Sequence, residues 1–353
     1  MSAQTVLITG LNGYTAPHIA HQFLNKGWNV RGTVRSDSKK EKVLNLSAFK
    51  NWVDQGKVEV VIVEDFLTSD YTEALNGVDA VVLAASPFNM TLSTYEEFAT
   101  PAIQGTKRVL EAAAKVSSIK AIAYVSSGVS ILDVFQPLDS YGGRLVTEKD
   151  WLESTEEDAK KESDSPTKKA LWYAVSKKYA ELAARETKKE TGASYALSSY
   201  CPTVVYGPVQ ETDDLKDLQH APGSDLSASA LYHLLVGGEN APLLPEHHVQ
   251  YLDVRDLASA IYAGVDKKSE GRFITAGYEF FYQDFVNIAR RLRPDLSKFI
   301  VKGDSNGSTS PPVGSYRFDR SASEKELGIK YHTLEETVRD TIARFEEMGA
   351  YKA

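Results

Sequence analysis

The first 200 residues alternate short apolar runs, rich in β-branched residues, with longer segments in which apolar residues recur at helical spacing. This alternation is typical of βαβ units, in which helices connect the strands of a parallel sheet. Because the apolar runs do not alternate with polar residues, we expect strands that are covered on both faces. Six strands are predicted, at residues 5–9, 29–34, 58–63, 80–84, 121–125 and 196–200.

Three long helices are predicted between these strands, at residues 14–26, 95–115 and 172–191. In the first of them Pro17 lies early enough for a first helical turn, and Gly27 stands where a helix would end. After Pro202 the rhythm breaks into shorter elements. The pattern there predicts helices at residues 226–236, 254–265, 282–292 and 333–348, and strands at 249–252 and 271–276.

Together these elements predict an α/β fold, a Rossmann-type doubly wound parallel sheet with a smaller interleaved C-terminal α/β unit. We expect residues 1–205 to form the Rossmann domain, with its sheet completed by roughly residues 248–268. Residues 206–247 and 269–353 are expected to form a substrate-binding region. Residues 153–167 are predicted to be a solvated surface loop because they are charged and contain few apolar residues, and residues 304–315 are predicted to be a second loop.

The composition excludes several classes of partner. The 353 residues include 40 Lys and Arg against 48 Asp and Glu, and the net charge of −8 has the wrong sign for binding nucleic acid or an anionic membrane. No apolar run approaches the roughly 18 residues that span a bilayer. A single cysteine, Cys201, fits a reducing compartment, and the N-terminus lacks the features of a secretory signal. We therefore expect a cytoplasmic monomer or homodimer without nucleic-acid or membrane partners.

A glycine-containing turn follows the first predicted strand and opens the first helix. In this GxxGxxA segment Gly10 allows a tight reversal, Gly13 lets the backbone approach a pyrophosphate, and Ala16 lets the helix pack close to the strand. The N-terminus of the helix offers unpaired N–H groups and partial positive charge to the phosphates. The placement favours a dinucleotide site over a merely structural turn.

The end of the second strand indicates which dinucleotide is bound. NAD sites usually present a carboxylate there, whereas a 2′-phosphate requires a cation. This strand ends in Arg35, and Lys39 follows one turn into the next element, so we predict NADP(H). The alternative is a basic helix start that faces solvent. Asp65 and Phe66, just past the third strand, are candidates for contact with the adenine, although an ordinary acid at a strand end explains Asp65 nearly as well.

A YxxxK pair provides candidate catalytic chemistry. Tyr173 and Lys177 lie one turn apart on a predicted helix, and Ser126 and Ser127 end the fifth strand. The spacing arises about once by chance in a chain with 18 tyrosines, so its weight comes from its position beside the strand ends where ligands bind. We expect the Lys177 ammonium and a cationic nicotinamide to stabilise the phenolate of Tyr173 and so lower its pKa. Tyr173 then protonates a carbonyl oxygen held by Ser127 while the cofactor delivers hydride.

The motifs together resemble the extended short-chain dehydrogenase/reductase superfamily. TGxxGxxA, YxxxK, the serine pair, CPTVVYGP and YLDVRDLA carry this resemblance. VRGTVRS, AASPF, TPAIQGTKRVLEAA, TEKDW and LDVRD resemble more narrowly the branch that contains dihydroflavonol reductase, cinnamoyl-CoA reductase and the fungal NADPH-dependent aldehyde, ketone and methylglyoxal reductases. The chain departs from this branch at residues 83–87, at Gln104 and in the 46 residues from Ser127 to Tyr173.

The resemblance implies an NADPH-dependent reductase of aldehydes or ketones with Ser127, Tyr173 and Lys177 as the catalytic triad. It also implies that residues 202–205 pass beside the nicotinamide. The implied cofactor contacts are Gly10, Leu11, Asn12, Gly13, Tyr14, Thr15, Arg35, Lys39, Asp65, Phe66, Tyr173, Lys177, Pro202 and Val205.

The substrate is expected to be a small carbonyl compound held by an apolar pocket. The candidate pocket residues lie one to five positions beyond a cofactor-side or catalytic residue: Phe88, Val129, Leu132 and Val204. Leu231, Tyr232, Leu234 and Leu235 suggest a further apolar wall but fit a core equally well.

Two other functions stay open. A nucleotide-sugar epimerase would need cations for a diphosphate, and a non-catalytic NADP-sensing regulator would have no use for a Ser/Tyr/Lys set. No metal site is expected, because His18 and His21, like His247 and His248, lack further ligands at metal spacing. Cys201 is expected to be a buried small apolar residue.

Overall fold

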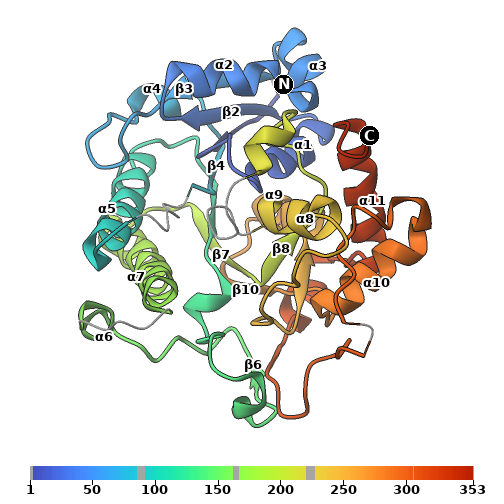
Figure 1. Ribbon diagram of the computed structural model, residues 1–353. Helices are drawn as coiled ribbons and strands as arrows, with labels where there is room; N and C mark the ends of the chain where they lie inside the picture. Colours follow the sequence, from blue (N-terminus) through green and yellow to red (C-terminus); the bar gives the residue numbers. More distant parts are fainter. Residues whose placement is uncertain (1–2, 86–91, 162–166, 220–226, 305, 353) are drawn as a thin grey trace.

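The protein is described by a computed structural model that covers residues 3–85, 92–161, 167–219, 227–304 and 306–352. Its centre is a seven-stranded parallel sheet with the strand order β10-β7-β5-β4-β1-β2-β3 (Figure 1). This sheet confirms the predicted Rossmann-type α/β fold. The strands are β1 Thr5–Ile8, β2 Asn29–Val34, β3 Val58–Ile62, β4 Ala80–Leu83, β5 Ala121–Val125, β7 Ala196–Pro202 and β10 Gly271–Thr275.

Helices cover both faces of the sheet, and most residues of its strands are therefore buried. In β1, Val6 and Ile8 join the core cluster that contains the apolar side of the first helix, whereas Leu7 joins the cluster on the opposite face. Two helix pairs dominate these layers (Figure 1). They are α1 Ala16–Asn25 with α9 Val254–Lys267, and α5 Tyr95–Ala113 with α7 Lys168–Thr191.

The other helices connect and extend this frame, and each predicted helix is found with its ends moved by a few residues. They are α2 Asp37–Asn45, α3 Ser47–Asp54, α4 Thr72–Leu75, α6 Glu156–Lys160, α8 Ala228–Val236, α10 Tyr282–Leu292 and α11 Leu334–Glu347. Single turns lie at η1 Gly128–Ser130, η2 Leu138–Tyr141, η3 Leu215–Leu218, η4 Pro294–Leu296 and η5 Ser323–Leu327. No helix within the described ranges is both long and apolar enough to cross a membrane.

The sheet is completed differently from the prediction. We expected roughly residues 248–268 to complete it, but β10 takes the outer position beside β7. Within the expected segment, β9 Tyr251–Asp253 pairs instead with β8 Val204–Tyr206 in a separate two-stranded sheet. β9 is short because Asp253 already caps α9, whereas β10 offers five residues that pair along β7. A second small sheet, β6 Leu145–Val146 with β11 Arg317–Phe318, was not predicted.

The charged segment at residues 153–167 is not simply a solvated loop, as we expected. Its described part contains α6, which begins at a capping box formed by Thr155 and Asp158. Ala159 is buried, and its carbonyl accepts a 2.7 Å hydrogen bond from the indole Nε1 of Trp172. A helix anchored by one small apolar residue leaves no periodic pattern in the sequence. The predicted loop at residues 304–315 contains no helix or strand at its described positions.

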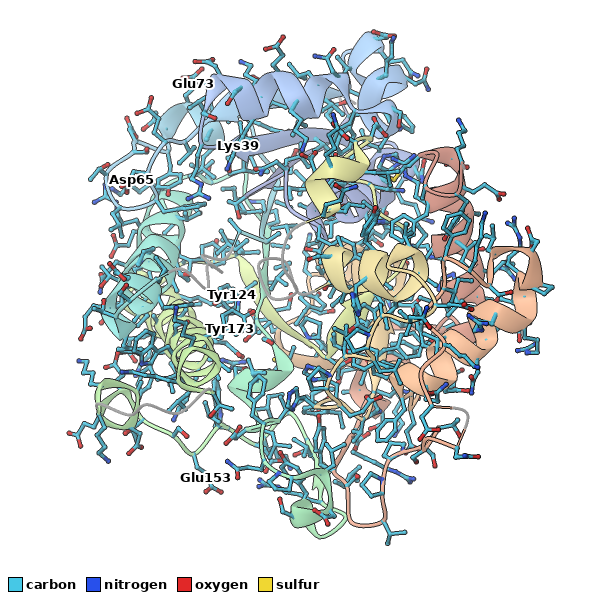
Figure 2. All side chains as sticks on the ribbon, in the orientation of Figure 1. Lys39, Asp65, Glu73, Tyr124, Glu153 and Tyr173 are labelled. Atoms are coloured by element: carbon cyan, nitrogen blue, oxygen red, sulfur yellow. The ribbon has the colours of Figure 1, made fainter. Side chains whose placement is uncertain are left out.

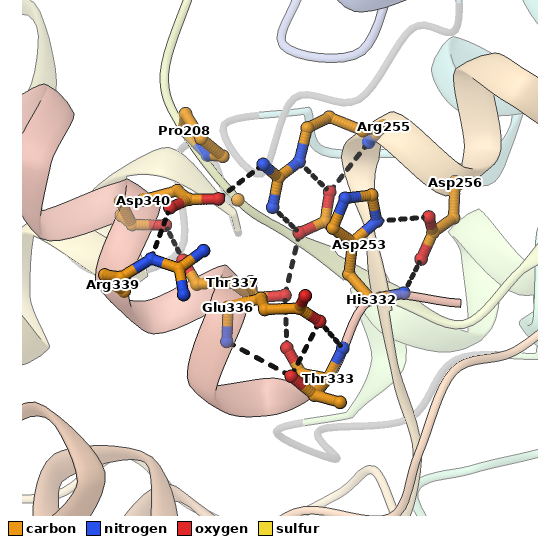
Figure 3. A network of polar contacts seen from close by, with 12 residues as sticks. Pro208, Asp253, Arg255, Asp256, His332, Thr333, Glu336, Thr337, Arg339 and Asp340 are labelled. Atoms are coloured by element: carbon orange, nitrogen blue, oxygen red, sulfur yellow. Dashed lines mark hydrogen bonds and ion pairs between the residues drawn. The ribbon is translucent and has the colours of Figure 1, made fainter. Parts of the chain in front are cut away.

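A polar network ties β9 and α9 to α11 (Figure 3). The Asp253 carboxylate caps α9, pairs with Arg255 at 2.7 Å and accepts a hydrogen bond from the Thr337 hydroxyl. One residue beyond Arg255, the Asp256 carboxylate contacts Nδ1 of His332 at 2.6 Å and accepts from the backbone N–H of the same residue. The LDVRD segment therefore fixes the C-terminal helix to β9 and to α9, which packs against the main sheet.

The Asp256–His332 contact should make stability depend on pH. The hydrogen bond to Asp256 raises the pKa of His332, so this contribution is complete below the unfolded value of about 6.5 and is lost as pH rises through the folded value. We expect His332→Gln to lower the free energy of unfolding by about 1 to 3 kcal/mol near pH 6, and by clearly less near pH 9. Denaturant unfolding of both proteins at the two pH values measures this difference.

His233→Gln is the control, because the His233 imidazole contacts the neutral carbonyl of Pro242. We expect it to show no comparable pH dependence. An equal loss for His332→Gln at both pH values would contradict a charged Asp256–His332 pair.

Candidate active site

A cavity of about 770 Å³ lies at the carboxyl ends of the central strands. It extends from the glycine turn after β1 to the triad residues on β5 and α7. Figure 2 shows Lys39 and Asp65 near its α2 and β3 side and Tyr173 on α7. The predicted site residues that line it are Gly10, Asn12, Gly13, Tyr14, Thr15, Arg35, Asp65, Phe66, Ser127, Val129, Tyr173, Lys177, Pro202, Val204 and Val205.

The glycine turn leaves room that side chains would fill. Gly10 has a φ of +69°, and a Cβ there would lie 3.0 Å from the Cβ of Ala85. The N–H of Gly13 bonds to the Gly10 carbonyl at 2.9 Å, which closes the turn. Thr15 makes no side-chain cap, and no acidic residue lies in the first turn of α1, all of which is described. An uncapped helix start beside a cavity fits a pyrophosphate.

Leu11 does not line the cavity, although it was predicted among the cofactor contacts. Its side chain is fully buried and lies over Gly32 of β2, where a Cβ would come within 2.1 Å of Leu11 Cδ2. Its N–H bonds to the carbonyl of Thr33 at 3.0 Å, so Leu11 anchors the turn to β2. Gly32 is the sequence signal for this close approach, and sequence reasoning missed it.

The predicted 2′-phosphate cations lie at one end of the cavity. Arg35 lines it, whereas Lys39, in the first turn of α2, is not among the lining residues. Burial, with a smaller contribution from the nearby Arg35, lowers the pKa of Lys39, so two cations gather there. Asp65 and Phe66 line the same end, and the Asp65 carboxylate also accepts backbone N–H groups of its own turn, from Leu67 at 2.5 Å and Thr68 at 3.2 Å.

The catalytic candidates meet where α7 lies against β5. The side chains of Ser127 and Tyr173 line the same cavity, and Ser127 lowers the pKa of the Tyr173 phenol. One turn along α7, Lys177 is 3% exposed, and its ammonium donates a 2.7 Å hydrogen bond to the carbonyl of Val125. The same ammonium lies 5.1 Å from the ring centre of Tyr124. The structure therefore brings the three predicted residues together in one cavity.

Burial dominates the pKa values of Tyr173 and Lys177. It raises the pKa of Tyr173 to about 12, against the lowering effect of the hydrogen bond with Ser127. It also lowers the pKa of Lys177 to about 8, partly opposed by Glu181. Lys177 is not among the groups that shift the pKa of Tyr173, so the expected lowering by the ammonium together with a cationic nicotinamide stays a prediction. At neutral pH Tyr173 carries its proton and is suited to donate it.

The predicted pocket is only partly as expected. Val129 and Val204 line the cavity, Leu132 is buried in a neighbouring core cluster, and Phe88 lies outside the described residues. Sequence reasoning missed several lining residues because they come from distant segments: Leu92, Glu97, Pro101, Val134, Phe135, Ala170, Ser227, His248 and Phe318. Of the residues proposed for a further wall, Leu231, Leu234 and Leu235 are buried in the core, and Tyr232 packs against Phe345.

The remaining histidines and the cysteine have structural surroundings. His18 Nε2 lies 2.8 Å from the carbonyl of Pro208, and His21 stacks on Phe49. Burial lowers the pKa of His248 to about 4, so a neutral imidazole faces the cavity. Cys201 is fully buried, as expected, and burial raises the pKa of its thiol to about 12.

Comparison with known proteins places this site in a family. The chain is 33% identical over 353 residues to an oxidoreductase of Schizosaccharomyces pombe, with 98% of each chain covered. It is 34% identical over 257 residues to aldehyde reductase 2 of Sporidiobolus salmonicolor, with 70% of each covered. The structure of yeast methylglyoxal/isovaleraldehyde reductase Gre2 complexed with NADPH superimposes with a TM-score of 0.82 at 25% identity, covering 98% of this chain and 100% of that one.

These similarities confirm the resemblance that the motifs carry. The sequence also matches the profile of the NAD dependent epimerase/dehydratase family over residues 6–277, which is most of the chain. The protein therefore belongs to the NAD dependent epimerase/dehydratase family.

Proposed function

We propose that the protein is an NADPH-dependent carbonyl reductase that converts aldehydes or ketones to alcohols. The observation that carries the proposal is that Ser127, Tyr173 and Lys177 line one cavity, which begins at the glycine turn. Relatives named aldehyde reductase and methylglyoxal reductase support the activity, and the yeast structure complexed with NADPH supports the cofactor.

The cofactor would lie between the glycine turn and residues 202–205. Gly10, Gly13 and the start of α1 would hold the pyrophosphate, and Arg35 with Lys39 would hold the 2′-phosphate. When bound, NADPH supplies the hydride that reduces the carbonyl carbon.

The protein residues handle the oxygen of the substrate. The hydroxyls of Ser127 and Tyr173 donate hydrogen bonds to the carbonyl oxygen, which gains negative charge as a C–H bond forms at the carbon. Tyr173 then gives its proton to this oxygen, so one hydride and one proton convert C=O to CH–OH. The Lys177 ammonium stabilises the phenolate that remains, and this phenolate is reprotonated before the next turnover.

The two other functions have less support. An epimerase must bind a nucleotide diphosphate, yet Arg35 and Lys177 are the only Lys or Arg residues among the described residues that line the cavity. Turnover of a UDP-sugar without net cofactor oxidation would favour that function. A sensor has no need of the Ser127–Tyr173 pair, and tight NADP(H) binding without turnover of any carbonyl compound would favour that alternative.

Removing the Tyr173 hydroxyl tests the proton donor. We expect Tyr173→Phe to lower kcat by at least about 100-fold, because general acid catalysis contributes about 10² to 10⁴ in rate. NADPH binding, measured by fluorescence titration, should stay close to that of the wild type. Tyr179→Phe, on the same helix but not among the cavity-lining residues, is the matched control and should keep its activity. A Tyr173→Phe enzyme with near-wild-type kcat would falsify the assignment.

Cofactor preference tests Arg35. A charge-assisted hydrogen bond contributes about 1.5 to 3 kcal/mol, so Arg35→Ala should lower kcat/KM for NADPH by roughly 10-fold to over 100-fold and leave that for NADH nearly unchanged. The preference should also shrink with added salt. Lys40→Ala is the control, because Lys40 lies on α2 next to Lys39 but lines a separate surface groove. Wild-type activity that is equal or better with NADH would contradict this cofactor choice.

The charge of the cavity predicts which carbonyl compounds react. Lys177 and Arg35 are the only Lys or Arg residues among the described residues that line the cavity. The sequence has no Lys or Arg at positions 86–91 or 220–226 either. The carboxylate of Glu97, in contrast, lines the cavity. We expect a neutral 2-oxo ester to exceed the corresponding 2-oxo acid in kcat/KM by about 10-fold or more. Steady-state kinetics with such a substrate pair measures this ratio.

Glu97→Gln should reduce the ester-to-acid ratio, because it removes the rim charge while glutamine still completes the α5 capping box. Glu96→Gln, one position away and outside the lining, serves as the control. An acid that reacts as well as its ester would contradict a pocket that selects neutral substrates.

A further inference from the structure

A buried ion pair lies directly behind the candidate triad. The Glu181 side chain is fully buried, and the Arg272 side chain on β10 is 4% exposed. Nε of Arg272 contacts Glu181 Oε1 at 2.8 Å, and Nη2 contacts Oε2 at 3.2 Å. The guanidinium also stacks on Trp151, 3.6 Å from its ring centre, and Nη1 donates to the carbonyls of Glu148 and Asp150. Neither residue belongs to the triad or lines the cavity.

The pair holds the turn that carries Ser127. The Ser126 hydroxyl donates to Glu181 Oε2 at 2.7 Å. Nη2 of Arg272 donates to the Ser130 hydroxyl at 3.0 Å, and that hydroxyl donates to the Ser127 carbonyl at 2.7 Å. Ser127 is therefore fixed from the preceding residue and through its own carbonyl, and the two chains of hydrogen bonds end on the same ion pair.

The pair also determines the charge around Lys177. Tyr173, Lys177 and Glu181 follow one another at intervals of four residues, so they lie along one stripe of α7 that faces β5. Besides Glu181, the groups that face Lys177 are the Tyr173 phenol, the Tyr124 ring on β5 and the Cys201 thiol on β7, with Arg272 and the half-exposed Arg185 beyond the carboxylate. Since burial keeps the two phenols and the thiol neutral, Glu181 supplies the negative charge.

A buried ion pair is a poor source of stability, because removing two charges from water costs about as much as their attraction returns. Stability alone therefore gives little reason to place one here, whereas Ser127 must be held within a few tenths of an ångström to act on a carbonyl oxygen. The contacts of the pair therefore point to a role in holding Ser127 in position.

We propose that Glu181 and Arg272 are positioning residues for the triad: the arginine fixes the turn that carries Ser127, and the carboxylate keeps the Lys177 ammonium charged. This inference rests on the proposed reductase function. It predicts that the two partners have separable effects, one on the pH dependence of the reaction and one on its rate.

The carboxylate is tested by Glu181→Gln, which keeps the size and the hydrogen-bonding oxygen but removes the charge. The ammonium is the active form, and burial already brings the pKa of Lys177 to about 8, so the reduction rate should fall as pH rises past that value. Without the carboxylate, this alkaline limb of the kcat profile should move to lower pH by about one pH unit. Labelling of Lys177 with a small amine-reactive reagent, measured by mass spectrometry, reports the same titration. The pH midpoint of labelling should move by the same amount.

The arginine is tested by Arg272→Lys, which keeps the charge but loses the fork that reaches Ser130 and the two carbonyls. We expect kcat to fall about 10- to 100-fold while the alkaline limb stays in place. Arg185→Gln is the matched control. It removes a cation that contacts Glu181 Oε1 at 3.3 Å, but Arg185 makes no hydrogen bond to the described residues of the Ser127 turn, so kcat and the alkaline limb should both stay unchanged. The double variant Glu181→Gln/Arg272→Gln removes both charges. It therefore tests the loss of the carboxylate without leaving one buried charge unpaired, which could by itself disturb folding.

The outcomes separate this inference from the proposed function. A wild type without carbonyl reduction contradicts the function, and the labelling experiment still tests the carboxylate. An unchanged limb and unchanged labelling in both Glu181 variants would overturn its role. A fall in kcat of equal size in Arg272→Lys and Arg185→Gln, or none in the former, would overturn the role of the arginine.

Discussion

The contact between α7 and the carboxyl end of β5 is the constraint on which the candidate site depends. It is made by polar groups in a buried setting: Lys177 donates to the Val125 carbonyl, and Glu181 accepts from Ser126. Both contacts use the carboxyl end of the strand, which is where ligands bind in open α/β sheets. Once α7 is held there, Tyr173 lies one turn from Lys177 and reaches Ser127. Packing of α7 against α5 supports this arrangement.

The cofactor half of the cavity depends on a different constraint, the close approach of backbone segments at the tips of β1, β2 and β4. Gly10 faces Ala85, and Gly32 makes room for Leu11, so larger residues at these glycines would separate the strand tips. Two threonine hydroxyls join the tips further, since Thr33 accepts from the Gly10 N–H and Thr9 accepts from the Ala85 N–H. These bonds form a rigid floor beneath the position proposed for the pyrophosphate, and a rigid site loses less entropy when a ligand binds.

The sequence predicted what local patterns encode, and it could not predict what distant segments bring together. The central strands were found because burial on both faces requires continuous apolar runs, and α1, α5 and α7 were found from their helical spacing. α6 was missed because only Ala159 enters the core. In the site, the glycine turn and the Ser/Tyr/Lys set were visible as motifs, whereas Phe318, Phe135 and His248 reach the cavity through β11 and loops that have no signal of their own. Arg272 was invisible as a site residue for the same reason, since its partner lies 91 positions earlier.

Burial shifts the two titrating members of the triad in opposite directions, and this has a consequence for the proposed reaction. The pKa of Tyr173 rises to about 12 while that of Lys177 falls to about 8. After Tyr173 has donated its proton, the neighbouring ammonium is the stronger acid of the two groups, so proton transfer from Lys177 to the phenolate is favoured. The phenolate therefore has a favourable proton source inside the cavity, and Lys177 recovers its own proton from solvent more readily below pH 8 than above it. In this scheme the carboxylate of Glu181 opposes the loss of the ammonium between turnovers, which links the buried ion pair to the proton balance of the site as well as to its geometry.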